Sequence, residues 1–347
     1  KEGQTLVNIN TSFGWKHVVD RIKMVNASQF KELYSEQLVN EKNPAFDFSG
    51  WNADTDWQDE VLQNGFITNN NISVTGASEK HSFYLGMGYS YEQGNIKHEK
   101  FSKITLNASN EYKITDKIKV GFQFNGARML PADSKSVLNA VRTTPIAPVF
   151  NEEYQLYAAL PEFQKAQMMN PMVDVDLKAN TTRAENYRAS GNIYGEVDFL
   201  EHFNFRAVFS MDYGSNNGRT YQPIIKVYDN TVKGNVATLG TGKTEVSQFK
   251  ENETKVQSDY VLTYTNSFGD HNLTATAGFT TYYNSLSRLD AARGQGIGLV
   301  IPDNPDKWFV SIGDLATATN GSTQWERTTV SFLGRVIYNY KGKYLFN

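Results

Sequence analysis

The chain has 347 residues, a formal net charge of −3 and no cysteine. A weakly acidic chain offers no electrostatic basis for binding nucleic acid, and the absence of cysteine excludes disulfide frameworks, thiolate metal sites and cysteine nucleophiles. Aromatic residues make up 13% of the sequence, although the mean hydropathy is polar at −0.50. So many amphipathic rings in a polar chain are unusual for a soluble core.

No run of 18 or more apolar residues occurs. This excludes a transmembrane helix, so a closed β-barrel is the remaining way in which the chain could cross a bilayer. The first residues, KEGQTLVNINTSFGW, lack the charged n-region and the apolar h-region of a signal peptide. We therefore expect an exported form of this protein to appear here as mature or truncated sequence.

Alternation of apolar and polar residues is the dominant pattern and predicts β-strands. In residues 83–91, for example, Phe83, Leu85 and Met87 lie on one side, and Gly86 and Gly88 lie on the other. Strands are predicted in the same way at residues 5–15, near 72–74, and at 83–91, 104–112, 118–126, 187–199, 203–213, 256–264, 273–283 and 330–340, with one more beginning at Tyr344. The sequence thus predicts about eleven strands of near ten residues each.

Two helices are predicted in the first long connection. Asn26 followed by ASQFKELYSEQLV, with Gln29 at the third position, has the pattern of a capping box. Thr55 and Gln58 suggest a second cap, before DWQDEVLQ and a stop at Gly65. Residues 161–172 and 286–307 are bounded by Pro and Gly, and we expect irregular loops there.

Short and long connections alternate between the predicted strands. Short turns are expected at residues 77–80, 115–117, 200–202, 268–270 and 341–343. Long loops are expected at residues 16–69, 92–101, 128–185, 214–253 and 284–327. An antiparallel meander with short turns at one end and long loops at the other is typical of an outer-membrane barrel, with periplasmic turns and extracellular loops.

The apolar side of these strands is predicted to face lipid. The competing interpretation is a soluble sandwich or lipocalin-like barrel, whose apolar faces meet in a shared core. Strands near ten residues, charged residues such as Arg188, Glu196 and Asp212 in mid-strand on the polar side, and aromatic residues near the strand ends favour a membrane barrel. The predicted lipid-facing residues are Phe83, Leu85, Ile104, Leu106, Val120, Phe122, Phe124, Phe205, Phe209, Leu262, Phe279 and Phe332.

Patterns that signal a cofactor or a catalytic site do not stand out. The five histidines lack metal-ligand spacing, DTDWQD at residues 54–59 lacks the glycine and glutamate of a calcium loop, and RGQGIG at residues 293–298 lacks the GK[ST] of a phosphate loop. We therefore expect no cofactor, no metal and no enzymatic activity. Aromatic and acidic loop residues are candidate contacts for a ligand or partner, through stacking and hydrogen bonds: Trp51, Trp57, Tyr154, Tyr157, Asp303, Asp306 and Trp308.

Several stretches resemble the SusC/RagA family of TonB-linked outer-membrane transporters. They are residues 55–128, which include TDW and ISVTGASEKHSFYLGMGY, and residues 335–347, RVIYNYKGKYLFN. The resemblance implies a 22-strand barrel closed by an N-terminal plug, in the outer membrane of a Gram-negative, Bacteroidetes-like bacterium. It implies import of large nutrients such as glycan fragments or peptides. The implied partners are a SusD-like surface lipoprotein, the TonB–ExbB–ExbD complex acting through the plug, and the lipid and lipopolysaccharide of the membrane.

The sequence departs from this family pattern in one large respect. It contains neither a plug nor a TonB box, and Asn347 falls within the expected eleventh strand. An open edge in lipid would leave unpaired N–H and C=O groups, so we expect residues 1–347 to be the first half of a larger barrel, with KEGQT where the plug joins. The alternatives are a passive porin or another outer-membrane receptor barrel, and a soluble all-β binding domain.

Overall fold

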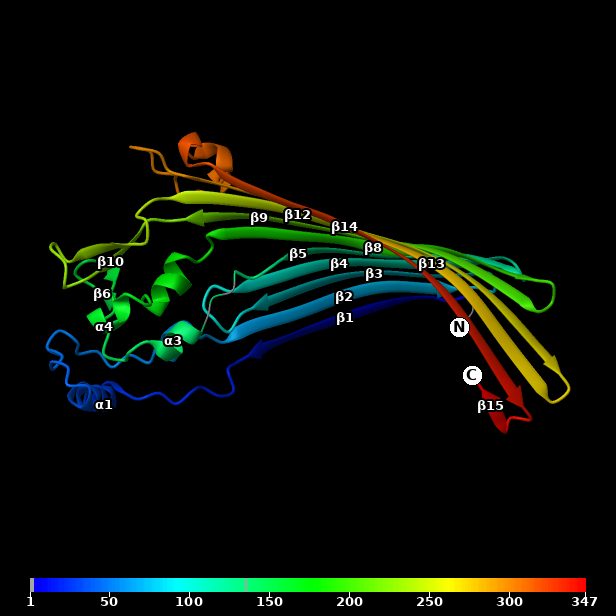
Figure 1. Ribbon diagram of the computed structural model, residues 1–347, viewed down its shortest axis with the longest axis horizontal. Helices are drawn as coiled ribbons and strands as arrows, with labels where there is room; N and C mark the ends of the chain where they lie inside the picture. Colours follow the sequence, from blue (N-terminus) through cyan, green and yellow to red (C-terminus); the bar gives the residue numbers. More distant parts are fainter. Residues whose placement is uncertain (1–2, 134, 136) are drawn as a thin grey trace.

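The computed structural model describes residues 3–133, 135 and 137–347, so the first two residues of the KEGQT segment lie outside it. It consists of one twisted antiparallel sheet of eleven strands with an elaborate set of loops at one end (Figure 1). The strand order is β1-β2-β3-β4-β5-β8-β9-β12-β13-β14-β15, so each strand pairs with its neighbour along the chain. This confirms the predicted all-β meander, and the sheet is open, with β1 and β15 at its edges.

The strands of the main sheet vary widely in length. Their bounds are β1 Thr5–Lys16, β2 Gly65–Ala77, β3 His81–Gln93, β4 Lys100–Thr115, β5 Ile118–Leu130, β8 Thr182–Phe199, β9 Phe203–Gln222, β12 Glu245–Phe268, β13 His271–Gly294, β14 Thr319–Tyr340 and β15 Tyr344–Phe346. The short turns between them gather at one end of the sheet and the long connections at the other, as predicted (Figure 1).

Several strands are much longer than the sequence predicts. β12 and β13 have 24 residues each, so the expected loops at residues 214–253 and 284–327 were wrong over much of their length. The connections actually run over residues 223–244 and 295–318. In the added segments both sides of the strand carry polar residues, such as Asn216 and Asn217. Backbone pairing continues there, but apolar and polar residues no longer alternate, so the sequence pattern does not indicate a strand.

The two predicted helices are present, with one correction. Helix α1 spans Ala27–Asn40, and Asn26 and Gln29 form the predicted capping box. Helix α2 is shorter than expected, Trp57–Val61, and its N-cap is Asp56 instead of Thr55. The Asp56 side chain accepts hydrogen bonds from two backbone N–H groups of the helix, whereas the Thr55 hydroxyl donates to the carbonyl of Ala147.

The loops contain further short elements that the sequence did not reveal. They are helices α3 Leu138–Arg142 and α4 Glu162–Lys165, the π-helix η1 Val173–Leu177, the 3-10 helices η2 Pro305–Lys307, η3 Val310–Ile312 and η4 Leu315–Thr317, the β6–β7 pair Phe150–Asn151 and Leu156–Tyr157, and the β10–β11 hairpin Ile225–Tyr228 and Val236–Leu239. The expected irregular segment 161–172 therefore begins with a helical turn, and the expected loop 286–307 begins as strand β13. In the described residues no helix is long and apolar enough to span a membrane.

The hydrophobic core lies in the loops and not on the sheet. Three clusters of buried apolar residues centre on Trp57 and Val61, on Tyr221 and Trp308, and on Val173. Among the buried apolar residues of the described chain, Tyr221 and Val246 belong to the main sheet, and both lie at the loop ends of their strands. The soluble alternative required a core shared by the sheet faces, and no such core exists in the described residues.

A close strand contact at Gly191 gives a first testable prediction. A Cβ at Gly191 of β8 would lie 2.4 Å from the carbonyl oxygen of Gln123 in β5, whereas a Cβ at Gly195 would meet nothing within 4 Å. Gly191→Ala should therefore force the two strands apart and cost about 1–3 kcal/mol, as overpacking does. The expected result is a lower midpoint in thermal unfolding of the purified protein.

Gly195→Ala is the matched control, because it lies on the same face of the same strand. We expect its midpoint to equal that of the wild type or to exceed it slightly. Equal midpoints for the two variants would contradict the close approach of β5 and β8.

Candidate functional site

The register of the sheet places the apolar side chains of all strands on one face. Directly paired residues in antiparallel strands share a face, and the pairs follow one another across the sheet. Ile72 pairs with Met87, which pairs with Leu106. Phe122, Ile193 and Phe209 form a second such row, and Tyr260, Phe279 and Phe332 a third. We call this continuous surface the apolar band.

All twelve residues predicted to face lipid lie on the apolar band. Nine of them are exposed, among them Phe332 at 80%, and Phe83, Phe205 and Phe279 are half-buried by neighbouring side chains. Exposed apolar surface on this scale is uncommon on a soluble monomer and marks a contact surface. Contact of these residues with acyl chains remains a prediction.

Aromatic rings cluster where the apolar band meets the short turns. Phe199 stacks on Phe203 at 5.6 Å between ring centroids, and His271 lies 4.8 Å from Tyr340. Further contacts at the same end are His81–Tyr112, Phe203–Tyr264, His202–Tyr264 and Tyr340–Tyr344. Rings with a polar edge favour the boundary between hydrocarbon and water, so this rim has the composition of an aromatic girdle.

The opposite face of the sheet carries a ladder of paired charges. Arg188 of β8 donates to Asp212 of β9 through Nε at 3.1 Å and through a second guanidinium nitrogen at 2.5 Å. Other ion pairs on this face are Lys119–Glu196, Arg206–Glu196, Lys255–Glu253, Arg288–Glu251 and Arg288–Asp290. Most of these side chains are partly solvated, so each pair adds little to stability. Their shared property is a hydrated surface on which charge is locally balanced.

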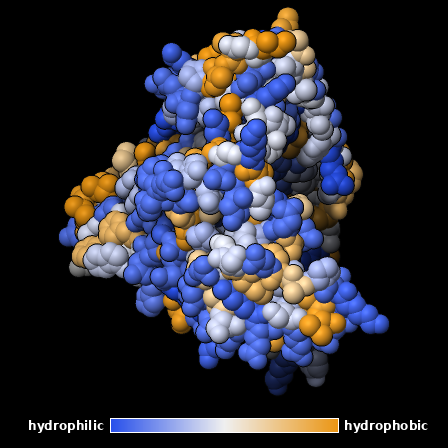
Figure 2. Space-filling view, turned by 90° about the vertical axis from the view of Figure 1, so that its left-hand side faces the viewer, coloured by the Kyte–Doolittle hydropathy of each residue, from blue (hydrophilic) through white to orange (hydrophobic). Residues whose placement is uncertain are grey.

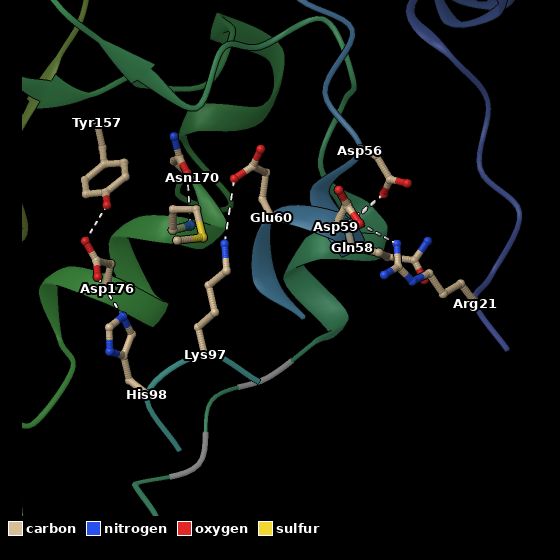
Figure 3. A network of polar contacts seen from close by, with 11 residues as sticks. Arg21, Asp56, Gln58, Asp59, Glu60, Lys97, His98, Tyr157, Asn170 and Asp176 are labelled. Carbon is tan, nitrogen blue, oxygen red and sulfur yellow. Dashed lines mark hydrogen bonds and ion pairs between the residues drawn. The ribbon is translucent and has the colours of Figure 1, made fainter. Parts of the chain in front are cut away.

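A network of polar contacts ties the loops together (Figure 3). The Tyr157 hydroxyl donates to Asp176, which also lies 2.7 Å from Nε2 of His98. Burial is the main cause that raises the pKa of Tyr157 well above its ordinary value, and the hydrogen bond to Asp176 is the second cause. The phenol therefore stays protonated and remains a donor. On the other side of the network, Arg21 lies 2.9 Å from Asp59.

Asn170 holds three loop segments at once. Its amide nitrogen donates to the carbonyls of Val149 and Ala158 at 2.8 and 3.0 Å, and its amide oxygen accepts from the N–H of Met172. The side chain is buried, with 1% of the residue exposed. A buried amide whose nitrogen and oxygen both form hydrogen bonds stabilises one arrangement of the loops. No sequence pattern predicts this role, because asparagine is common in loops.

The predicted ligand contacts do not form a single site. Trp57 and Trp308 are buried at 2% and 1% exposure. The Trp57 indole donates to the carbonyl of Thr144, and Trp308 stacks on Tyr221. These two tryptophans therefore support the loops from within. Trp51 and Tyr157 pack against the Trp57 cluster.

The remaining candidates lie near the loop surface. The ring of Tyr154 lies 5.0 Å from that of Tyr228 in a tilted arrangement, and Asp303 and Asp306 are exposed. Their contact with a ligand remains a prediction. Seen from the loop end, the surface is largely hydrophilic with separate apolar patches (Figure 2).

A cavity at the loop end was not foreseen from the sequence. It has a volume of about 430 Å³ and is lined by residues 21–26, 54–58 and 140–145, with Phe30 and Gln164. The lining combines the apolar Ile22 and Met24 with the polar Asp54 and Arg21. Such a mixture can accept a chain that has both apolar and hydrogen-bonding groups.

Comparison with known proteins adds the following findings. No protein-family profile matches the sequence. The chain is 26% identical to TonB-dependent receptor P3 of Formosa agariphila, over 98% of this chain and 32% of that protein. It is 22% identical to TonB-dependent receptor SusC of Bacteroides thetaiotaomicron, over 100% of this chain and 34% of that protein. The chain thus spans about a third of the length of these curated relatives.

The fold matches a solved structure. The RagAB peptide importer in its closed-closed state superposes with a TM-score of 0.76 at 14% identity, covering 98% of this chain and 41% of the other. The eleven-strand sheet therefore corresponds to part of that barrel.

A buried carboxylate between two loop segments generates a prediction. Asp229, beside the β10–β11 hairpin, accepts from Lys165 at 3.2 Å and from the N–H and hydroxyl of Thr231. Burial by itself would raise the pKa of Asp229, but the bonds from Thr231 and Lys165 together hold it below the ordinary 3.8. The carboxylate therefore stabilises the hairpin at neutral pH, and this stabilisation is lost as pH falls through that lowered pKa.

Asp229→Asn should remove the charge that holds Lys165, at a cost of about 1.5–3 kcal/mol. Backbone hydrogen exchange in residues 225–239 should speed up about tenfold or more at neutral pH. Glu162→Gln is the control, since Glu162 also pairs with Lys165 but its side chain is 69% exposed. Similar exchange rates in both variants would contradict a clamp at Asp229.

Proposed function

Because this chain belongs to the SusC/RagA family of outer-membrane TonB-dependent receptors, we propose that it forms part of the wall of a barrel that imports large nutrients across the outer membrane. The observation that carries the proposal is the register, which separates an exposed apolar band from a face of balanced charges. In a membrane barrel the first surface meets acyl chains and the second lines a water-filled lumen.

Closure of the barrel follows from the same physics. An open strand edge in hydrocarbon leaves unpaired N–H and C=O groups, each costing several kcal/mol. We therefore place residues 1–347 in the first half of a barrel of about 22 strands, as the family resemblance implies. Further strands would pair with β1 and β15, and a plug would occupy the lumen.

Substrate and partners are proposed from the loops and from the relatives. The solved relative is described as a peptide importer, and the loop layer here has its own cores and a cavity of about 430 Å³ lined by apolar and polar groups. These features suit an extended oligomer, a peptide or a glycan fragment, held beneath a SusD-like lipoprotein lid. Energy would come from TonB–ExbB–ExbD through the plug.

Growth on defined nutrients tests import. Cells that lack the gene for the full receptor should lose growth on peptides or glycan oligomers too large for general porins, and should keep growth on the corresponding monomers. Loss of TonB should have the same effect. Uptake that persists without TonB would instead indicate a passive pore.

A further prediction tests the lipid contact of the apolar band. Phe122→Arg should cost about 2–4 kcal/mol, as arginine does near the bilayer midplane, and Phe205→Arg should cost less, because Phe205 lies two residues from the aromatic rim at Phe203. The expected result is a much smaller folded, membrane-inserted fraction of the full receptor, read from heat-dependent mobility on gels.

Gln123→Arg, next to Phe122, and Ser210→Arg, in the same strand as Phe205, are the controls, because both residues lie on the opposite face. We expect near-normal insertion for both. Equal losses in the two classes would show that acyl chains do not solvate the apolar band.

A further inference from the structure

Two arginines oppose each other on the outer face of the sheet, the face that carries the apolar band. Arg183 of β8 and Arg219 of β9 are direct partners in the register. Lys250 of β12 is a diagonal neighbour of Arg219, since Arg219 pairs with Gln248. Like charges directly opposite each other destabilise a sheet. An anion bound between them would turn this repulsion into attraction.

The protein neutralises these three cations in part: the charge of Glu185 acts on Arg219, and Glu185 and Asp306 lie beside the three cations. Over the described ranges, none of the three lies within ion-pair distance of a carboxylate. The nearby Glu185 accepts from Arg128 at 2.8 Å and from the Tyr187 hydroxyl at 2.5 Å, so its oxygens are already engaged. The contrast with the balanced ladder on the opposite face points to a charge supplied from outside.

An open groove of about 700 Å³ lies over these residues. Its lining includes the cations Arg183, Arg219 and Lys250, which outnumber the carboxylates Glu185 and Asp306, and also Phe309. The ring of Phe309, on the loop that folds over this face, lies 4.0 Å from the guanidinium carbon of Arg219. Stacking of this kind holds the guanidinium plane and leaves its N–H edge available for a bidentate acceptor.

The position of the groove relative to the apolar band selects the ligand. Tyr187 and Tyr213 end the band in β8 and β9, and Arg183 lies four residues beyond Tyr187 on the same face. At about 3.3 Å per residue in a strand tilted by about 40°, this is roughly 10 Å along the membrane normal. That depth corresponds to lipid head groups and not to acyl chains. A solute in the lumen is on the other side of the sheet.

We propose that Arg183, Arg219 and Lys250 form a site for the phosphate of an outer-leaflet lipid head group. Paired guanidinium groups match the geometry of phosphate oxygens, and the ammonium of Lys250 adds a flexible point charge. The site would fix the depth of the barrel in the membrane and order a lipid against the base of the loops. This inference rests on the outer-membrane placement in the proposed function.

Lipid binding by the purified full receptor in non-ionic detergent tests the site. The probe is lipid A carrying its phosphates, compared with the same lipid after dephosphorylation, with binding followed by native mass spectrometry. Arg183→Gln combined with Arg219→Gln should weaken binding of the phosphorylated lipid about tenfold. The matched control combines Arg188→Gln with Arg206→Gln, which removes one arginine from each of the same two strands on the opposite face, and its affinity should stay within about twofold of wild type.

Several outcomes would overturn the site. These are equal affinity of the two double variants, equal binding of the phosphorylated and dephosphorylated lipid, or binding of inorganic phosphate alone as tight as that of the lipid. The folded fraction of each variant is checked on gels, so a folding defect is recognised. If the lipid result fails while Phe122→Arg still blocks insertion, the proposed function stands without this site.

Discussion

The structure depends on the alignment of eleven strands such that alternate residues fall on the same face throughout. A slip of one residue in any pair would move apolar side chains to the polar face, because the side-chain period of a strand is two. Rows such as Phe122, Ile193 and Phe209 exist only because the β5–β8 and β8–β9 registers agree. A register irregularity between Lys113 and Thr115 occurs next to a short turn, where it leaves the band unchanged.

This alignment explains why hydrophobic burial is concentrated at one end of the molecule. In the described residues, loop residues such as Trp308 cover the sheet at Tyr221 and Val246, at the loop ends of their strands. Elsewhere the sheet relies on its backbone ladders and on the solvent that each face meets. The loops, in contrast, bury Trp57, Trp308 and Val173 in cores of their own. Asn170 and the Asp176 network then connect segments that are far apart in the sequence.

The two faces of the sheet differ in how their charged side chains are paired. On the polar face, Arg188 and Asp212 neutralise each other, as do Arg288 and Glu251. A wall of balanced charge binds water and attracts no single ionic solute strongly, which suits a passage for large molecules. At the upper edge of the apolar band, Arg183 and Arg219 face each other, and neither forms an ion pair in the described residues. This excess of positive charge is the feature on which the proposed phosphate site rests.

The sequence by itself determined the strand periodicity, the short turns, the capping box at Asn26 and the face to which Phe122 or Phe332 belongs, because these depend on neighbours close in the chain. It could not give the true lengths of β12 and β13, since pairing continues where both faces are polar and hydrophobicity no longer alternates. Only the tertiary structure decided that Trp57 and Trp308 are buried, that Asp56 caps α2, and that Arg183 faces Arg219. The buried tryptophans and the facing arginines depend on contacts between segments separated by tens of residues, and local sequence patterns carry no information about such contacts. The Asp56 cap is local, but the competing Thr55 hydroxyl is engaged by the distant carbonyl of Ala147.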